Sequence, residues 1–270
     1  MFLTDLYIGG ISAIISRSLT APLELFKLQR QNSFMPYSTL RDVIRKEGPL
    51  YLWKGNATNC MRAFPQFSIN YAVFEYSKSH IFSSIQNPRQ RNFLAGGISG
   101  MTALTCMYPL ETLRSRLSLQ ICHNHYKSIG DAIKKMALKD MYQGLKMSLI
   151  GFGPYNALNF SLYFYFTESL QNTNTHPLFQ KFLAGGLSGV AAVSITYPTD
   201  LIRRRLQLQG FDSNVPRYKG ILDCVSKITR TEGVKGLYRG LLATYIKLFP
   251  TTAIQFLVMD MCNEEFKNKY

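Results

Sequence analysis

Three basic side chains stand alone inside stretches of the sequence that are otherwise uncharged. Arg17, Arg62 and Lys247 are each the only charged residue in a stretch of about 18 to 20 residues. A cation in apolar surroundings attracts anions strongly, because a low dielectric constant weakens screening. We therefore expect these side chains to bind a ligand with several negative charges. The formal charge of +15 over 270 residues also favours an anionic partner.

A second set of charges follows three prolines at a constant spacing. Pro22, Pro109 and Pro198 each stand two positions before an acid and five before a base. The acids are Glu24, Glu111 and Asp200, and the bases are Lys27, Arg114 and Arg203. Proline bends a helix, and residues three apart share a helix face. Because an unpaired buried charge costs several kcal/mol, we expect these acids and bases to pair.

Long uncharged stretches predict the elements that position these side chains. Six of them have about 18 to 21 residues, enough for a helix to cross about 30 Å of bilayer core. They are residues 6–23, 55–74, 92–110, 147–167, 182–199 and 240–259. Glycine, serine and proline in them lower the hydropathy but suit close helix packing in lipid. We expect six membrane-spanning helices with both termini on one side.

The three isolated bases fall at one predicted depth. Arg17 follows the centre of its span, whereas Arg62 and Lys247 precede the centres of theirs by a similar number of residues. Odd and even spans run in opposite directions, so all three lie about 4 Å from the midplane, on the side of the proline motifs. Cations gathered at one level predict a cavity for a polyanion.

Four features recur three times in register. Each repeat has a run of small residues, a proline motif, an aromatic-x-glycine segment and a further proline ten residues later. The small runs begin at Ile8, Leu94 and Leu183; the segments read WKG, YQG and YRG; the later prolines are Pro65, Pro154 and Pro250. This register predicts an internal repeat with units 1–87, 88–176 and 177–270. Basic amphipathic segments between the spans predict interfacial helices.

The pattern P-x-[DE]-x-x-[KR]-x-[KR], followed by [DE]-G-x4-[WYF]-[KR]-G, resembles the mitochondrial carrier family. The resemblance covers essentially the whole chain, although the second repeat, reading DMYQG, is four residues shorter and leaves its interfacial helix open. It implies an all-α membrane protein of six transmembrane helices in three pseudo-symmetric repeats around a central cavity. It also implies a monomeric solute transporter, not an enzyme, in the mitochondrial inner membrane.

The resemblance implies a gate at each side of the membrane. The proline motifs would form the matrix gate through the pairs Glu24–Arg114, Glu111–Arg203 and Asp200–Lys27, braced by Gln31 and Gln207. Ser118 takes the third of these positions and is not expected to act as a brace. A weaker cytoplasmic gate would use Glu75, Lys78 and Asp260. We therefore expect the unliganded protein to rest with the matrix gate closed and the cytoplasmic side open.

The family's contact points imply a substrate site. Its residues would be Arg17, Arg62, Gly151, Phe152, Tyr155 and Lys247. The bases suit phosphates, the glycine lets a flat base approach the backbone, and the aromatic rings stack on it. Adenine or other nucleotides fit this pattern, with exchange by alternating access; coenzyme A and thiamine pyrophosphate remain alternatives. No resident cofactor or metal is expected.

Helix starts predict lipid contacts. The three aromatic-x-glycine segments present backbone N–H groups where phosphate is favoured. In the family such segments bind cardiolipin, which implies contacts by Trp53, Lys54, Gly55, Tyr142, Gly144, Tyr238, Arg239 and Gly240. Anchoring by an aromatic belt is the alternative reading.

Other function classes fit the sequence poorly. A basic nucleic-acid-binding helical repeat needs amphipathic helices, whereas these spans are uncharged around their circumference, so no nucleic-acid partner is expected. A membrane enzyme needs a catalytic constellation, and none is evident. The five cysteines are scattered and predict reduced thiols. Met1 almost adjoins the first span, so no cleaved leader is expected.

Overall fold

The computed structural model describes residues 2–32, 40–119, 126–170, 177–210, 215–248 and 250–251. Every regular element in these ranges is a helix. The chain divides into two compact units, which are described separately. The first comprises Met1–Leu25, Thr39–Tyr142 and Thr251–Tyr270, and the second comprises Phe26–Ser38 and Gln143–Pro250. The boundary falls inside α2 (Ala21–Gln31).

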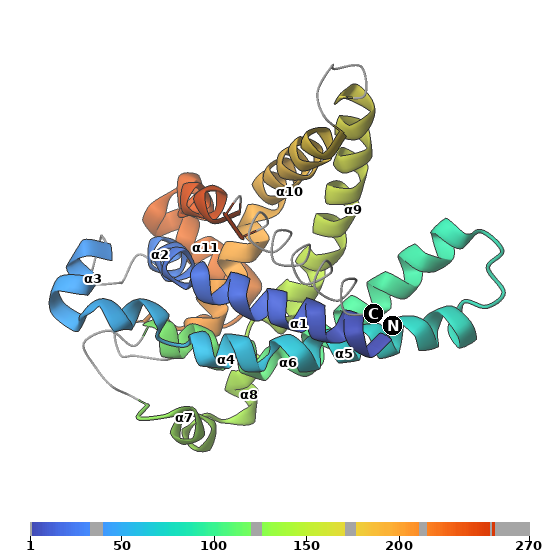
Figure 1. Cartoon of the computed structure of the whole chain (residues 1–270). Coiled ribbons are helices and arrows are strands. Elements are labelled where there is room, and N and C mark those ends of the chain that lie inside the picture. Colours follow the sequence, from blue (N-terminus) through green and yellow to red (C-terminus); the bar gives the residue numbers. More distant parts are fainter. Residues whose placement is uncertain are drawn as a thin grey trace. The chain divides into compact units, whose positions relative to one another are not determined.

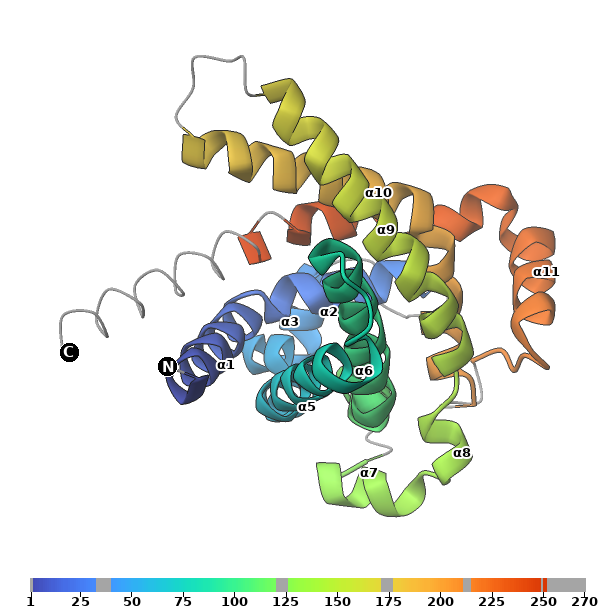
Figure 2. The same ribbon diagram turned by 90° about the vertical axis from the view of Figure 1, so that its right-hand side faces the viewer.

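The first unit is built on a helical hairpin with a third helix beside it. Its elements are α1 (Phe2–Leu19), α3 (Leu40–Glu47), η1 (Pro49–Trp53), α4 (Asn56–Met61), α5 (Ala63–Tyr76), η2 (Ser77–Ile81), α6 (Pro88–Leu119), α7 (Ile129–Lys135) and α8 (Leu138–Met141). Helices α5 and α6 run antiparallel, and α1 lies along α4 and α5 (Figures 1 and 2). The approach of α1 depends on Gly10, where a Cβ atom would overlap the ring of Phe64.

The second unit is built on another antiparallel hairpin. Its elements are the end of α2, α9 (Leu145–Leu170), α10 (Pro177–Leu208), α11 (Ile221–Glu232) and η3 (Val234–Tyr238), followed by helical residues 241–248. Helix α9 packs along α10 (Figure 1). The buried core of the unit consists of Met147, Tyr197, Leu201, Ile202, Leu206, Cys224 and Ile228. This core fixes α11 against the end of α10 that carries the proline motif.

The prolines act differently in the three repeats. Pro109 and Pro198 lie inside the continuous helices α6 and α10, where each removes one backbone hydrogen bond. In the first repeat the chain instead divides at Thr20, and α2 begins one residue before Pro22. The Thr20 hydroxyl donates to the Ser16 carbonyl at 2.7 Å, so the end of α1 is satisfied locally.

All three interfacial helices form, including the one that the shorter second repeat left open. Helices α3 and α11 each lead into a short 3-10 helix, whereas α7 leads into the single turn α8. The Ser128 side chain caps α7 by accepting the Asp131 N–H at 3.2 Å. The missing residues therefore shorten the connection after the helix and do not remove the helix itself.

A glycine in the left-handed region precedes each even-numbered predicted span. The φ angles of Gly55, Gly144 and Gly240 are 83°, 86° and 87°. Residues with a Cβ atom rarely adopt this conformation, which explains the glycine at the end of every aromatic-x-glycine segment.

Among the described helices, only α6 is both long enough and apolar enough, by length and composition, to cross a membrane. Its most apolar 18 residues have a mean hydropathy of 1.2, and 22% of them are buried inside the protein. Glycine, serine and polar residues lower the mean hydropathy of the other long helices, and the sixth predicted span continues beyond the described residues.

Candidate substrate-binding site and gates

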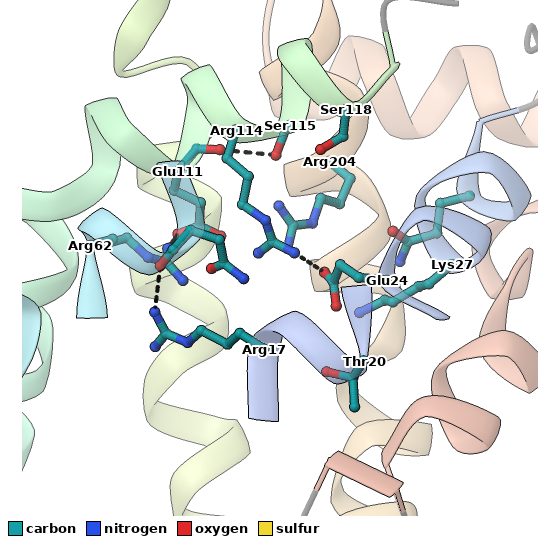
Figure 3. A network of polar contacts seen from close by, with 12 residues as sticks. Arg17, Thr20, Glu24, Lys27, Arg62, Glu111, Arg114, Ser115, Ser118 and Arg204 are labelled. Atoms are coloured by element: carbon teal, nitrogen blue, oxygen red, sulfur yellow. Dashed lines mark hydrogen bonds and ion pairs between the residues drawn. The ribbon is translucent and has the colours of Figure 1, made fainter. Parts of the chain in front are cut away.

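Five charged side chains gather in the first unit (Figure 3). They are Arg17, Glu24, Arg62, Glu111 and Arg114. Helices α1 and α6, the first turn of α2, and the turn between α4 and α5 contribute them. Three guanidinium groups face two carboxylates, so the cluster has a net positive charge. Its chemistry suits an anion, because guanidinium groups bind phosphate and carboxylate through paired N–H donors.

The first ion pair of this cluster joins two proline motifs. Arg114 Nη2 lies 3.1 Å from Glu24 Oε1, and the two side chains are only 11% and 8% exposed. The sequence predicts this partnership for the matrix gate, and the structure brings the two residues together. Opening such a contact in buried surroundings would require each charge to find a new partner.

The second ion pair joins residues that the sequence assigned to different tasks. Arg62 Nη1 lies 3.0 Å from Glu111 Oε2, with side-chain exposures of 13% and 4%. Arg62 is a predicted substrate contact, whereas Glu111 is a predicted acid of the matrix gate. The Glu111–Arg203 pair would join the two units and stays a prediction.

Arg17 is held differently from the other cations of the cluster. Its Nη1 donates to the main-chain carbonyl of Asn59 at 2.8 Å. Within the part of the chain that the structure describes, Arg17 makes no ion pair. Arg62 and Arg114 lie near enough to repel it electrostatically (Figure 3). A cation oriented by a carbonyl, beside two other cations, suits an incoming anion.

The second unit contains a separate charged pair from the predicted matrix gate. Lys27 Nζ lies 2.9 Å from Asp200 Oδ2. Gln31 Nε2 donates to the same oxygen at 3.1 Å and to the Tyr197 hydroxyl at 3.2 Å. Gln31 therefore contacts the Lys27–Asp200 pair, and its role as a brace of a gate stays a prediction. Gln207, the second predicted brace, is fully buried, and its Oε1 accepts from Arg204 Nη1 at 3.0 Å.

The predicted site residues did not include a network of ion pairs around Arg205 and Glu232. Arg205, which is 2% exposed, lies 2.8 Å from Glu232 Oε1, and its Nε donates to the Gln31 carbonyl at 3.0 Å. Arg239 also reaches Glu232, at 3.4 Å. The repeat motifs could have pointed to both residues, because Arg205 is the last base of its proline motif and Glu232 is the acid before Gly233. These contacts tie α10 to α11 and to the following turn.

The predicted substrate contacts of the second unit lie on α9 and on the helix after Gly240. A Cβ atom at Gly151 would lie 2.6 Å from Thr199 Oγ1, so the missing side chain serves close packing of α9 on α10. Phe152 and Tyr155 follow on α9, partly exposed, and Lys247 is partly exposed on helical residues 241–248. Contact of these residues with a substrate stays a prediction.

The arrangement of three repeats with these motifs has a counterpart among known proteins. A family model described as mitochondrial carrier protein matches residues 1–84, 86–174 and 174–270. The chain belongs to the mitochondrial carrier family. The carrier is therefore a multi-pass transporter of the mitochondrial inner membrane and not an enzyme.

Several mitochondrial carriers are similar to this one along nearly its whole length. Mitochondrial substrate carrier family protein A of Dictyostelium discoideum is 31% identical over 98% of this carrier and 86% of its own length. Mitochondrial adenine nucleotide transporter ADNT1 of Arabidopsis thaliana is 30% identical, with coverages of 96% and 86%. Solute carrier family 25 member 16 of Mus musculus is 31% identical, with the same coverages.

The predicted cytoplasmic gate of the carrier is described only in its first repeat. Lys78 Nζ lies 3.7 Å from Glu75 Oε1, one turn away on the same helical segment, and 5.8 Å from the centre of the Phe74 ring. Both charged side chains are more than a third exposed. This pair is local, and a weak one at that exposure. Asp260 lies outside the described residues.

The aromatic-x-glycine segments of the carrier pack on the proline motifs through their aromatic rings and main chain. Trp53 Nε1 donates to the Ser18 carbonyl at 2.9 Å. The Tyr142 ring stacks on Tyr108 at 6.4 Å, and the Tyr238 ring stacks on Tyr197 at 6.3 Å. The three segment aromatics nevertheless remain 37% to 44% exposed. Exposed rings at helix starts suit the membrane interface.

Two of these segments meet the same position of another repeat's proline motif. The Ser118 hydroxyl donates to the Lys54 carbonyl at 3.0 Å, and a Cβ atom at Gly55 would overlap that hydroxyl. Gly240 similarly lies against Gln31, where a Cβ atom would come within 3.0 Å of Cγ. Ser118 and Gln31 both follow their motif's proline by nine residues. Ser118, which stands where the other two motifs have glutamine, thus anchors the turn before α4.

Proposed function

We propose that this carrier exchanges phosphate-bearing anions, foremost adenine and other nucleotides, across the mitochondrial inner membrane by alternating access. The observation that carries the proposal is the cluster of Arg17, Arg62 and Arg114, whose three positive charges exceed the two negative charges beside them. Such a surplus of partly buried cations favours the binding of an anion. The adenine nucleotide transporter among the relatives supports the same substrate class.

Each predicted contact has a role in this proposal. Arg17, Arg62 and Lys247 would hold the phosphates, and the rings of Phe152 and Tyr155 would stack on the base. Gly151 keeps α9 close to α10 at Thr199, and Phe152 and Tyr155 follow it on α9. An adenine nucleotide carries both the charge and the flat ring that this set of residues fits.

The gates follow from the same proposal. The matrix gate would consist of the pairs Glu24–Arg114, Lys27–Asp200 and Glu111–Arg203, with Gln31 and Gln207 as braces. Its first two pairs are in contact. The cytoplasmic gate would consist of Glu75, Lys78 and Asp260, and its described pair is exposed and local. This difference supports a resting state that is closed toward the matrix and open toward the cytoplasm.

The lipid contacts and the organisation of the chain complete the proposal. Cardiolipin would bind at the aromatic-x-glycine segments, where left-handed glycines begin the even helices and leave N–H groups toward the interface. The carrier would act as a monomer of three repeats, residues 1–87, 88–176 and 177–270.

Uptake into proteoliposomes tests the substrate class. The purified carrier is reconstituted and offered radiolabelled ADP, ATP, AMP, deoxynucleotides, coenzyme A and thiamine pyrophosphate, each with and without internal substrate. We expect nucleotides to be taken up fastest and only against internal nucleotide. Faster uptake of coenzyme A or thiamine pyrophosphate would replace the nucleotide proposal, because these molecules present similar charges.

Variants test the site in the same assay. Arg17→Gln and Lys247→Gln should each lower uptake about ten- to a hundredfold, because a hydrogen bond to a charged group contributes about 1.5–3 kcal/mol. Lys235→Gln, on the exposed surface of η3, removes the same charge outside the site and should leave uptake unchanged. Unchanged uptake by the Arg17 and Lys247 variants would overturn the assignment of the site.

A further inference from the structure

The Arg62–Glu111 contact joins the proposed substrate site to an internal carboxylate. Arg17 and Arg62 are neighbouring cations of one cluster, but only Arg62 has a carboxylate at ion-pair distance among the residues described. Glu111 Oε2 stands 3.0 Å from Arg62 Nη1, where a ligand phosphate oxygen would otherwise stand. Both side chains are nearly buried, so water does little to weaken their attraction.

We propose that Glu111 is a specificity-determining residue that occupies Arg62 until a ligand with a doubly charged phosphate displaces it. The inference rests on the proposed function, because it assigns Arg62 to the substrate. In this view Glu111 acts as an internal competitor, and it sets the minimum charge that a ligand must carry to gain both Arg17 and Arg62.

Charge and shape give the phosphate its advantage over the carboxylate. A terminal phosphate carries about −1.5 to −2 charges at pH 7 and presents three acceptor oxygens, whereas Glu111 contributes one charge. A guanidinium group binds such an anion through two parallel N–H donors. A ligand with a single negative charge has no electrostatic advantage over Glu111, which is already in place and needs no binding entropy.

The neighbouring residue limits the cost of displacing Glu111. Arg114 follows Glu111 by three residues on α6, and so lies on the same helix face. A carboxylate that leaves Arg62 therefore remains close to another guanidinium group. Without such a neighbour, an unpaired carboxylate that is only 4% exposed would be too costly to release.

Binding of two matched ligands to the full-length carrier in detergent tests the proposal. The ligands are AMP and its phosphate methyl ester, which differ by one methyl group and one negative charge. The wild-type carrier should bind AMP at least about tenfold more tightly than the ester, a difference of about 1.4 kcal/mol. Glu111→Gln should raise the affinity for the ester about tenfold and so remove most of the discrimination.

Glu24→Gln is the matched control. It removes one buried carboxylate from the same cluster, but that carboxylate pairs with Arg114 and not with Arg62. It adds the same net positive charge, so it should change the affinities for AMP and for the ester by similar factors and leave the discrimination between them unchanged within about threefold. Equal effects of the two variants would mean a general change of charge and would overturn the proposal. The proposal would also be overturned if the double variant Arg62→Gln/Glu111→Gln bound the ester more tightly than Arg62→Gln alone.

Inorganic pyrophosphate separates this inference from the proposed function. A carrier that neither binds nor transports nucleotides, yet binds pyrophosphate more tightly after Glu111→Gln, would refute the nucleotide proposal and retain the competition. A carrier that transports nucleotides, but whose affinity for pyrophosphate and for the ester is unchanged by Glu111→Gln, would retain the nucleotide proposal and refute the competition. Where Glu111→Gln does not fold, Glu111→Asp withdraws the carboxylate from Arg62 by one methylene and should also raise the ester's affinity; an unchanged affinity in that variant counts against the proposal.

Discussion

The hydroxyl of Tyr197 donates a hydrogen bond to the main-chain carbonyl of Arg239 at 2.9 Å. Tyr197 precedes the proline of the third motif, and Arg239 is the middle residue of an aromatic-x-glycine segment. The bond therefore links α10 to the turn that begins the last described helix. Gly240 follows in the left-handed conformation and lies against both Tyr197 and Gln31. This packing is the basis of the first prediction.

Gly240→Ala should destabilise the carrier strongly. A side chain at φ 87° costs about 1–2 kcal/mol, and its Cβ atom would lie only 3.0 Å from Tyr197 Oη and Gln31 Cγ, which adds about 1–3 kcal/mol of overpacking. Gly210→Ala is the control, because its φ is also positive but its nearest neighbour would be 3.6 Å away. The melting temperature in detergent should fall clearly further for Gly240→Ala. Equal shifts would show that the contact contributes nothing.

Exchanging the charges of Lys27 and Asp200 should restore only part of the stability and the uptake that each single substitution removes. Asp200→Asn leaves the Lys27 ammonium without its carboxylate, which costs toward the lower end of about 3–5 kcal/mol because the Asp200 side chain is 30% exposed. Lys27→Asp/Asp200→Lys recreates the pair, but Gln31 Nε2 then faces an ammonium group in place of an oxygen. Melting temperature and nucleotide uptake measure both effects. A double variant no better than the worse single variant would argue against direct pairing.

The carboxylate of Asp223 should make the stability of α11 depend on pH. The Lys219 N–H, together with the Lys227 ammonium, holds the pKa of Asp223 below its ordinary value of 3.8. Because the folded-state pKa is depressed, the stabilisation is complete above pH 3.8 and is lost as the pH falls through the folded-state pKa. The difference in melting temperature between the wild type and Asp223→Asn should therefore shrink below about pH 4.

A second helix provides an internal repeat of that experiment. Asp131 on α7 accepts from the Lys127 N–H and from Lys135, both at 2.9 Å, and its pKa is lowered for the same reasons. Asp131→Asn should show the same pH profile. A constant difference down to the lowest pH would contradict the assigned partners.

Arg205→Gln should destabilise the carrier although the position is far from the proposed substrate contacts in sequence. It removes the bonds to Glu232 and to the Gln31 carbonyl, so a largely buried carboxylate loses its shortest ion-pair contact and keeps the longer one to Arg239. Breaking a buried pair costs about 3–5 kcal/mol. Arg217→Gln, on the exposed loop before α11, is the control and should leave the melting temperature unchanged. Similar melting temperatures for both variants would show that the contacts of Arg205 do not stabilise the fold.

Local spacing in the sequence was sufficient to predict the repeats and their chemistry. The interval between each proline and its acid and base predicted which side chains share a helix face. Two of the three pairs that the family resemblance implied, Glu24–Arg114 and Lys27–Asp200, are in contact. The glycines of the aromatic-x-glycine segments all adopt the left-handed conformation. These features depend on the helical period and on backbone sterics, which are properties of a few neighbouring residues.

Choices between alternative partners were not readable from the sequence. Glu111 could pair with any base at a similar depth in the membrane. In the tertiary structure Arg62 Nη1 lies 3.0 Å from its carboxylate. Gly151 could leave room for a ligand or for a helix, and it packs on Thr199. Ser118 departs from the glutamine of the other two motifs, yet it bonds the carbonyl of Lys54.

The sequence by itself therefore determined the number of repeats, the helices and the kind of charge that lines them. The tertiary structure alone decided that Glu111 meets Arg62 and that Gly151 serves packing. The physical reason is that a helix has a fixed rise and turn, whereas the distance between side chains of different helices depends on packing summed over the whole unit. A shift of one or two ångströms there exchanges one ion-pair partner for another.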